Sequence, residues 1–198
     1  MPAIFRALLL GMLLTLNLPC HAADAPPQVK VKRVKGMLII DMSMQVPVRQ
    51  QLAFEVLTDY SHMASFISGI KESKITQTNG NRLQVTQNGK AGSGILSISW
   101  DTVRDVTLNA PHEVQSKIIG GSVKQGESTT RFTQEGTQTK IVMHSESSAS
   151  AALPPVVGVS FVEGQIKKQY AEFRDEMLKR QKLAESSSTP LPPETPHK

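Results

Sequence analysis

The chain has 198 residues, of which 39% are apolar and one is cysteine, and its 22 basic and 17 acidic side chains give a formal charge of +5. This length is enough for one domain with its own hydrophobic core, and a single cysteine excludes a disulfide framework. The basic residues are spread along the chain and only 5% of the residues are aromatic, which argues against a nucleic-acid-binding protein.

The first residues have the pattern of a secretory signal peptide. Arg6 is followed by the almost wholly apolar run Ala7–Leu18 and then by Pro19-Cys20-His21-Ala22-Ala23. A positive start, an apolar run and small residues at the end are typical of such a peptide, and the run is shorter than the about 20 residues that span a bilayer. We therefore expect a signal peptide over residues 1–23, cleaved after one of the last two alanines, and a periplasmic or secreted protein without cysteine.

A short polar lead, residues 24–28, precedes the first regular element. From Val29 to Val46 apolar and polar residues alternate, which predicts one half-buried strand or two strands joined at Gly36. Pro47 ends the pattern and suits the first turn of a helix. The alternation is clearest at Leu38, Ile40, Met42, Met44 and Val46.

A short helical section comes next. Val48–Leu57 is predicted to be helical, and Tyr60, Met63 and the pair Phe66-Ile67 continue at helical spacing until a glycine ends the segment at position 69. The section contains Phe54-Glu55-Val56-Leu57-Thr58-Asp59-Tyr60, followed by Met63, Phe66, Gly69-Ile70 and Lys71-Glu72-Ser73.

This succession resembles the START-related (SRPBCC) proteins of the polyketide cyclase and coenzyme Q-binding type. The order of the remaining elements agrees with that resemblance over most of residues 29–183, which we interpret as one START-like domain. The resemblance implies a helix-grip fold that holds a sterol, lipid, quinone or other apolar molecule between its sheet and its long helix.

The middle of the chain is predicted to be a series of antiparallel strands separated by turns. Ile75–Gln77 is expected to pair with Arg82–Asn88 across a hairpin turn, and the glycine-rich segment 89–94 is expected to be the next turn. Their many Ser, Thr and Gln residues suit strands with one solvent-facing side. Further strands are expected at Leu96–Thr102, His112–Ile119, Ser122–Gln134 and Thr139–Ser147, with turns at 109–111, 120–121 and 136.

The segment Leu153–Leu183 is predicted to be one long helix. Its apolar residues recur at steps of three and four, and charged residues occupy the opposite face. At 1.5 Å per residue it would be roughly 45 Å long, and the Ser- and Pro-rich residues 184–198 are expected to be disordered. The apolar stripe consists of Val159, Val162, Ile166, Tyr170, Phe173 and Met177. Together these elements predict an α+β fold in which a curved antiparallel sheet of about six or seven strands wraps around the C-terminal helix.

No constellation of residues predicts a catalytic or metal site. The histidines lack metal-ligand spacing, and we expect neither a metal nor another cofactor. His144 and Glu146 lie two residues apart, which favours an exposed strand pair over an acid–base pair. His62 is expected at a loop surface, and Asp59 is expected to brace local backbone amides.

The apolar residues favour a ligand cavity instead. Tyr60, Met63, Phe66 and Ile67 would by resemblance form a flap over one end of the cavity, and the other predicted ligand contacts come from the strands and the long helix. Those further contacts are Trp100, Phe132, Phe161, Ile166 and Tyr170.

Three functions follow as alternatives. The first is an exported, monomeric START-like protein that binds a hydrophobic small molecule and makes transient contact with membranes. The second is an aromatase or cyclase acting in the same cavity, in which Tyr60 or His144 would take part. The third is a module whose groove binds a segment of a partner protein.

Overall fold

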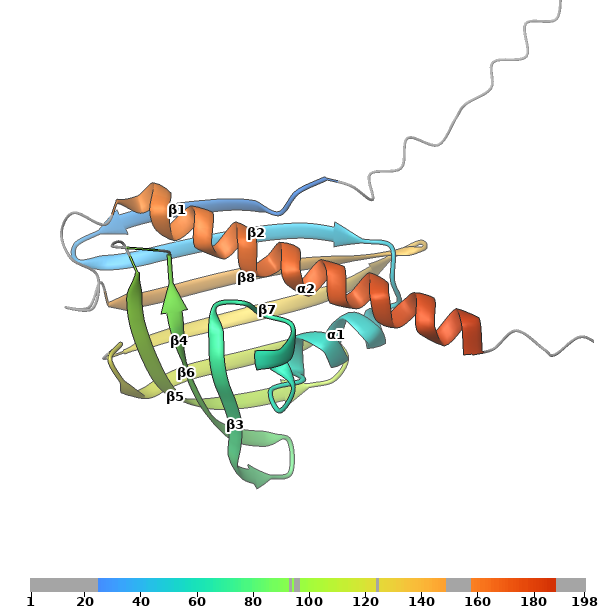
Figure 1. The fold of residues 1–198 in the computed structure, drawn as a ribbon, viewed down its shortest axis with the longest axis horizontal. Coiled ribbons are helices and arrows are strands. Elements are labelled where there is room, and N and C mark those ends of the chain that lie inside the picture. The colour runs from blue at the N-terminus through green and yellow to red at the C-terminus, as the bar shows by residue number, and fades with distance from the viewer. Residues whose placement is uncertain (1–24, 93, 95–96, 124, 149–157, 188–198) are drawn as a thin grey trace, which may run out of the picture.

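The computed structural model describes residues 25–92, 94, 97–123, 125–148 and 158–187. Within them one curved antiparallel sheet of eight strands lies against one long helix, with a short helix and a single 3-10 turn between the second and third strands (Figure 1). The strands are β1 (Gln28–Val34), β2 (Met37–Val46), β3 (Ile70–Asn79), β4 (Arg82–Ala91), β5 (Ile98–Asn109), β6 (Glu113–Gly121), β7 (Gly126–Glu135) and β8 (Gln138–Ser148). The helical elements are α1 (Gln50–Thr58), the 3-10 turn η2 (Met63–Ser65) and α2 (Val159–Ser187).

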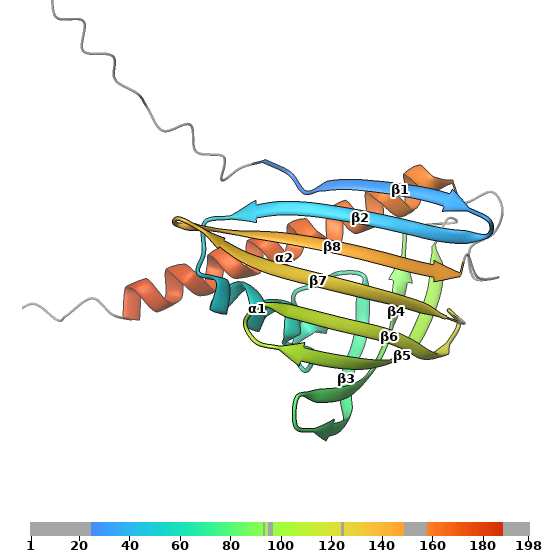
Figure 2. The same ribbon diagram turned by 180° about the vertical axis from the view of Figure 1, so that it is seen from behind.

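The strand order is β1-β2-β8-β7-β6-β5-β4-β3, so β2, from the start of the chain, pairs with β8, the last strand of the sequence. Seen from behind, β1, β2, β8, β7, β6 and β5 run side by side and α2 crosses beyond them (Figure 2). The helix therefore covers the concave face of the sheet, and α1 lies below its C-terminal half (Figure 1).

The structure confirms the α+β fold of a curved antiparallel sheet around a long C-terminal helix, but it has eight strands where six or seven were predicted. The segment 29–46 is two strands, because Lys35 and Gly36 adopt positive φ values of 49° and 81° and reverse the chain. The predicted turns at 89–94 and 120–121 were placed too early, since Gly89 lies inside β4 and both Gly120 and Gly121 belong to β6.

The C-terminal end of α2 extends further than predicted. It continues through Ser187, four residues past the predicted end at Leu183, so the start of the predicted disordered tail is helical. Ala184 and Glu185 are good helix formers, and Gln181 Nε2 donates to Glu185 Oε1 at 2.9 Å one turn away. The signal peptide, the predicted helix start at 153–157 and residues 188–198 lie outside the described residues.

The core is concentrated under one half of α2. Tyr170, Phe173 and Met177, from the middle of the helix onward, are buried, whereas Val159, Val162 and Ile166 nearer its N-terminus are only partly buried. Because both halves carry the same apolar stripe, this difference means that the N-terminal half is packed less tightly, although α2 does contact β1 at the edge of the sheet. None of the described helices combines the length and the apolar character needed to cross a membrane.

Candidate ligand-binding cavity

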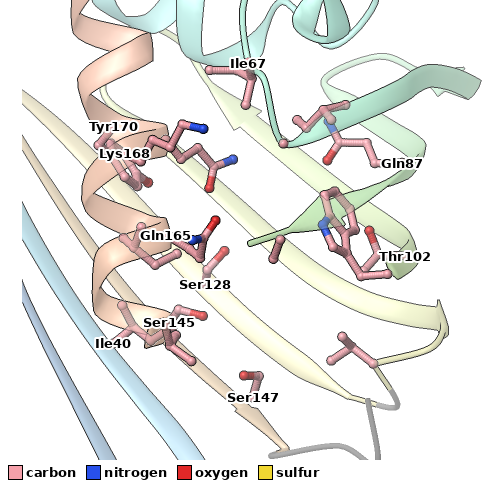
Figure 3. Close-up of a pocket in the computed structure, with 18 of the residues that line it drawn as sticks. Ile40, Ile67, Gln87, Thr102, Ser128, Ser145, Ser147, Gln165, Lys168 and Tyr170 are labelled. Atoms are coloured by element: carbon pink, nitrogen blue, oxygen red, sulfur yellow. The ribbon is translucent and has the colours of Figure 1, made fainter. Parts of the chain in front are cut away.

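A cavity of about 640 Å³ lies between the N-terminal half of α2 and the concave face of the sheet. Its walls come from β2, from the end of α1 and the segment after it, from β3 to β8 and from α2. Figure 3 shows Gln165, Lys168 and Tyr170 on the helix side, with Ser128, Ser145 and Ser147 on the strands below them. The volume falls in the range of about 300–1,000 Å³ that is usual for small-molecule sites.

Seven of the nine predicted ligand contacts line this cavity. They come from the loop after α1, from β5 and from α2, which are far apart in the sequence and meet only through the fold. The seven are Tyr60, Met63, Ile67, Trp100, Phe161, Ile166 and Tyr170.

Phe66 and Phe132 are not among the lining residues, and the structure places them in the packed part of the molecule. Phe132 is 3% exposed and packs edge-on against Phe54, with ring centroids 5.5 Å apart. Phe66 packs against Phe173 at 6.0 Å and lies under the Arg180 guanidinium. Both side chains face inward, as the apolar pattern of the sequence indicates. That pattern does not show whether an inward-facing residue belongs to the packed core near α1 or to the cavity.

A row of serines that was not predicted from the sequence lies on the cavity floor. Ser116 on β6, Ser128 on β7 and Ser145 on β8 are direct cross-strand partners, and all three line the cavity. None of their hydroxyl groups has a side-chain hydrogen-bond partner within the described part of the chain. The strand alternation could have revealed Ser145, because it continues the inward series of Ile141 and Met143.

Arg104 was also missed, and it is the cationic side chain that β5 points into the cavity. Its Nη2 donates to Gln87 Oε1, and Gln87 in turn donates to Ser73 Oγ at 2.9 Å. The guanidinium lies 6.0 Å from the centre of the Tyr60 ring. Its Nε is buried and has no hydrogen-bond partner in the described residues, a situation that costs about 1–3 kcal/mol for an ordinary polar group.

Tyr60 and Tyr170 add two phenol groups near Arg104. Burial raises the pKa of Tyr60 above its ordinary value, although the charge of Arg104 opposes this. Burial raises the pKa of Tyr170 to about 12, outweighing its side-chain hydrogen bond with Thr130. Both phenols therefore remain protonated at neutral pH, so they can donate hydrogen bonds to a ligand but are poor bases.

His144 lies on the other side of the sheet from the cavity. It is 51% exposed, its Nδ1 is 2.7 Å from Asp41 Oδ1 and its Nε2 is 3.3 Å from Glu146 Oε1. The hydrogen bond with Asp41, followed by that with Glu146, raises the pKa of the His144 ring. The exposed strand pair is confirmed, and the cyclase alternative therefore loses His144 as a candidate. His62 is likewise at the surface, 73% exposed.

Asp59 anchors the segment before the cavity to α2. It was expected to brace backbone amides, but its side chain bonds to His62 Nδ1 at 2.7 Å and to Arg180 Nη2 at 2.8 Å. Arg180 Nε also donates to Glu176 Oε1 at 2.8 Å. A second connection joins Ser68 to Glu172 on α2, through Oγ–Oε1 at 2.5 Å. These two connections hold both ends of the 59–68 segment against the helix.

We expect Arg180→Gln to lower the free energy of unfolding by about 1–3 kcal/mol at pH 7, because Asp59 and Glu176 would lose a charged hydrogen-bond donor. Burial alone would raise the pKa values of Asp59 and Glu176, but their hydrogen bonds outweigh it and hold both below the ordinary 3.8 and 4.5. Groups with lowered pKa values stabilise the fold above those ordinary values, and this contribution is lost as the pH falls through the folded-state values.

Urea titrations of the wild type and Arg180→Gln from pH 7 down to pH 3 measure this effect. The stability difference should be constant above about pH 5 and should shrink below it. The matched control is Lys182→Gln, an exposed position on the same helix, which should change stability by less than about 0.5 kcal/mol. A difference between wild type and Arg180→Gln that does not depend on pH would contradict the role of the two carboxylates.

An antiparallel sheet gripping a C-terminal helix, with a partly open space between them, defines the helix-grip class. The family described as polyketide cyclase / dehydrase and lipid transport matches residues 37–180, more than half of the chain, and the chain belongs to this START-like family. No curated protein matches the sequence.

Several solved structures share the fold. A STAR-related lipid transfer protein from Xanthomonas axonopodis has a TM-score of 0.64 and 9% identity, covering 77% of this chain and 94% of that one. The Zhui aromatase/cyclase from Streptomyces sp. R1128 has a TM-score of 0.58 and 16% identity, covering 73% and 96%. A START superfamily protein from Mycobacterium smegmatis has a TM-score of 0.53 and 12% identity, covering 72% and 95%. At these identities the similarity establishes the fold and leaves the ligand open.

Proposed function

We propose that this protein is an exported carrier that binds a hydrophobic small molecule, such as a lipid or a quinone, in the cavity between the sheet and α2. The observation that carries the proposal is the 640 Å³ space beneath a helix whose apolar stripe continues over it. The helix supplies Phe161, Val162 and Ile166 to its roof. A ligand that buries about 300 Å² of apolar surface would gain roughly 7 kcal/mol before the entropic costs of binding.

Export rests on the signal-peptide pattern of Arg6 and Ala7–Leu18. The lipid transfer protein from Xanthomonas axonopodis supports the carrier proposal as a protein of the same fold with that named activity. Transient contact with membranes would let such a carrier load and release its ligand, and we propose it on that ground.

The test is recovery of a ligand. The protein lacking residues 1–23 is incubated with a total lipid extract, separated from unbound lipid and examined by native mass spectrometry. We expect about one lipid or quinone molecule per chain. The neutral dye N-phenyl-1-naphthylamine, which fluoresces in apolar surroundings, should bind with the same stoichiometry and be displaced by the recovered molecule. Recovery of no lipid or quinone, together with no dye binding, would refute the carrier proposal.

An enzyme of the cyclase type is the second candidate, favoured by the polar groups that meet at one end of the cavity. Arg104, Tyr60 and Tyr170 are hydrogen-bond donors within one buried region, and donors of this kind can polarise a ligand carbonyl. The aromatase/cyclase from Streptomyces sp. R1128 shares the fold. Chemical change of the bound ligand during incubation, lost in Tyr60→Phe without loss of binding, would favour this function over that of a carrier.

A groove for a partner segment is less well supported. The large exposed apolar side chains of the described residues come from five different elements, which does not indicate a single docking patch. These are Val34, Ile75, Ile119, Val142 and Leu183.

A further inference from the structure

The cavity is electropositive. Among the described residues that line it, four are cationic, namely Lys71, Lys90, Arg104 and Lys168, and one, Glu172, is acidic. Glu172 already accepts hydrogen bonds from Ser68 and lies 3.9 Å from Lys168 Nζ. A hollow with an excess of one charge raises the local concentration of ligands of opposite charge.

Arg104 differs from the three lysines in its surroundings. Each of the lysines is exposed, whereas Arg104 is partly buried. Within the described residues it forms no ion pair, and its one hydrogen bond goes to the neutral Gln87. The Nε is buried without an acceptor. A guanidinium presents its N–H groups as a planar fork that matches the two oxygens of a carboxylate or phosphate.

The serine row begins near Arg104 in the strand register. On β6, Ile118 is the cross-strand partner of Arg104, and Ser116 is the next residue of β6 on the same face. From Ser116 the row continues through Ser128 to Ser145. The sheet side of the cavity therefore offers a guanidinium on β5 and three hydroxyl groups on β6, β7 and β8. The helix opposite contributes apolar side chains, such as Phe161 and Ile166, together with polar ones, such as Gln165.

We propose that the ligand is an amphipathic anion, whose carboxylate or phosphate oxygens bind Arg104 and whose apolar body lies against α2. Oxygen atoms along the edge of this body would bond to the serine row. This inference rests on the proposed ligand-binding function and specifies the chemical class of the ligand.

The test compares ligands that share one apolar chain and differ in the head group: hexadecanoic acid, hexadecyl phosphate and hexadecanol. Each displaces N-phenyl-1-naphthylamine from the wild-type protein. We expect at least one of the two anions to bind at least about tenfold more tightly than the alcohol, as a charge-assisted hydrogen-bond pair provides. Whichever anion binds more tightly identifies the head group as carboxylate or phosphate.

In Arg104→Gln this preference should fall to less than about threefold, while the alcohol binds as it does to the wild type. Arg82→Gln, which removes one positive charge from an exposed position on β4, should keep the preference. Because Arg104→Gln also disturbs the bond to Gln87, Arg104→Lys is the second variant. It should fold, keep the charge and retain part of the preference without the planar fork.

The outcomes separate the two proposals. If the wild type binds neither the dye nor any of the three amphiphiles, the ligand-binding function itself fails. If the alcohol and both anions bind equally well, the anionic ligand is overturned and the carrier proposal stands. If an anion preference is present but neither Arg104 variant changes it, the binding of the head group to Arg104 is overturned.

Discussion

Replacing Ser145 with phenylalanine is expected to reduce binding of N-phenyl-1-naphthylamine by at least about tenfold, while the protein stays folded. Ser145 is a small side chain on the cavity floor, between Ile40 on β2 and Ser128 on β7. A phenyl ring built there occupies part of the cavity, which Ser145 and Ile166 both line, and so takes space that a ligand would use. Since this space is not filled by protein atoms in the wild type, the ring does not have to displace core side chains.

The matched control is Val142→Phe on the same strand. Val142 faces the other side of the sheet and is 41% exposed, so the same ring there leaves the cavity unchanged. Fluorescence titration of the dye measures binding, and circular dichroism of both variants verifies the fold. Unchanged dye affinity in Ser145→Phe would show that the dye binds elsewhere and that the cavity is not the ligand site.

Most of the fold could be predicted from periodicity. The step of three and four in α2 identified one face of a long helix, and its buried residues Tyr170, Phe173 and Met177 lie on the predicted stripe. Asn79-Gly80-Asn81 identified the β3–β4 hairpin. Such signals are local, because the pattern that defines the element lies within ten to thirty consecutive residues.

The parts of the cavity that could not be predicted depend on partners distant in sequence. Arg104 is one of 22 basic residues, and only the strand register places it beside Ser116 and the buried Gln87. Phe132 shows the opposite problem: its inward direction could be predicted, but its neighbour Phe54 belongs to a helix 78 residues away in the sequence. Inward-facing strand residues continue from packed core into cavity without any change in the pattern.

The glycine-rich segment 89–94 was also misleading, because the role of Gly89 depends on a neighbour from another strand. Gly89 was interpreted as the start of a turn, yet it lies inside β4, paired with Ile70 on β3. A Cβ atom at this position would clash with the Gly69 carbonyl oxygen and lie 2.8 Å from Trp100 Cζ2. The glycine is therefore needed for close approach of two backbones, at the point where the chain enters β3 and where Gly69 and Lys90 line the cavity.

We expect Gly89→Ala to lower the free energy of unfolding by about 3 kcal/mol, the upper part of the range for overpacking, because one of the atoms that must move belongs to the backbone. Lys90 N donates to Gly69 O at 2.9 Å, and the shift would weaken this bond as well. Urea unfolding of the wild type and the variant at pH 7 measures the change. Dye affinity should fall in parallel, since the same backbone segment forms the cavity wall.

Gly164→Ala is the control for the general effect of replacing glycine. Gly164 is exposed on α2, and nothing lies within 4 Å of a Cβ atom added there. Alanine is the better helix former by about 1 kcal/mol, so this variant should be more stable than the wild type while Gly89→Ala is less stable. If Gly89→Ala were as stable as the wild type, the close approach of Gly69 to β4 would not hold in solution. The backbones at Gly69 and Gly89 would then have to lie further apart than in the structure, and the cavity lined by Gly69 and Lys90 would be wider at this point.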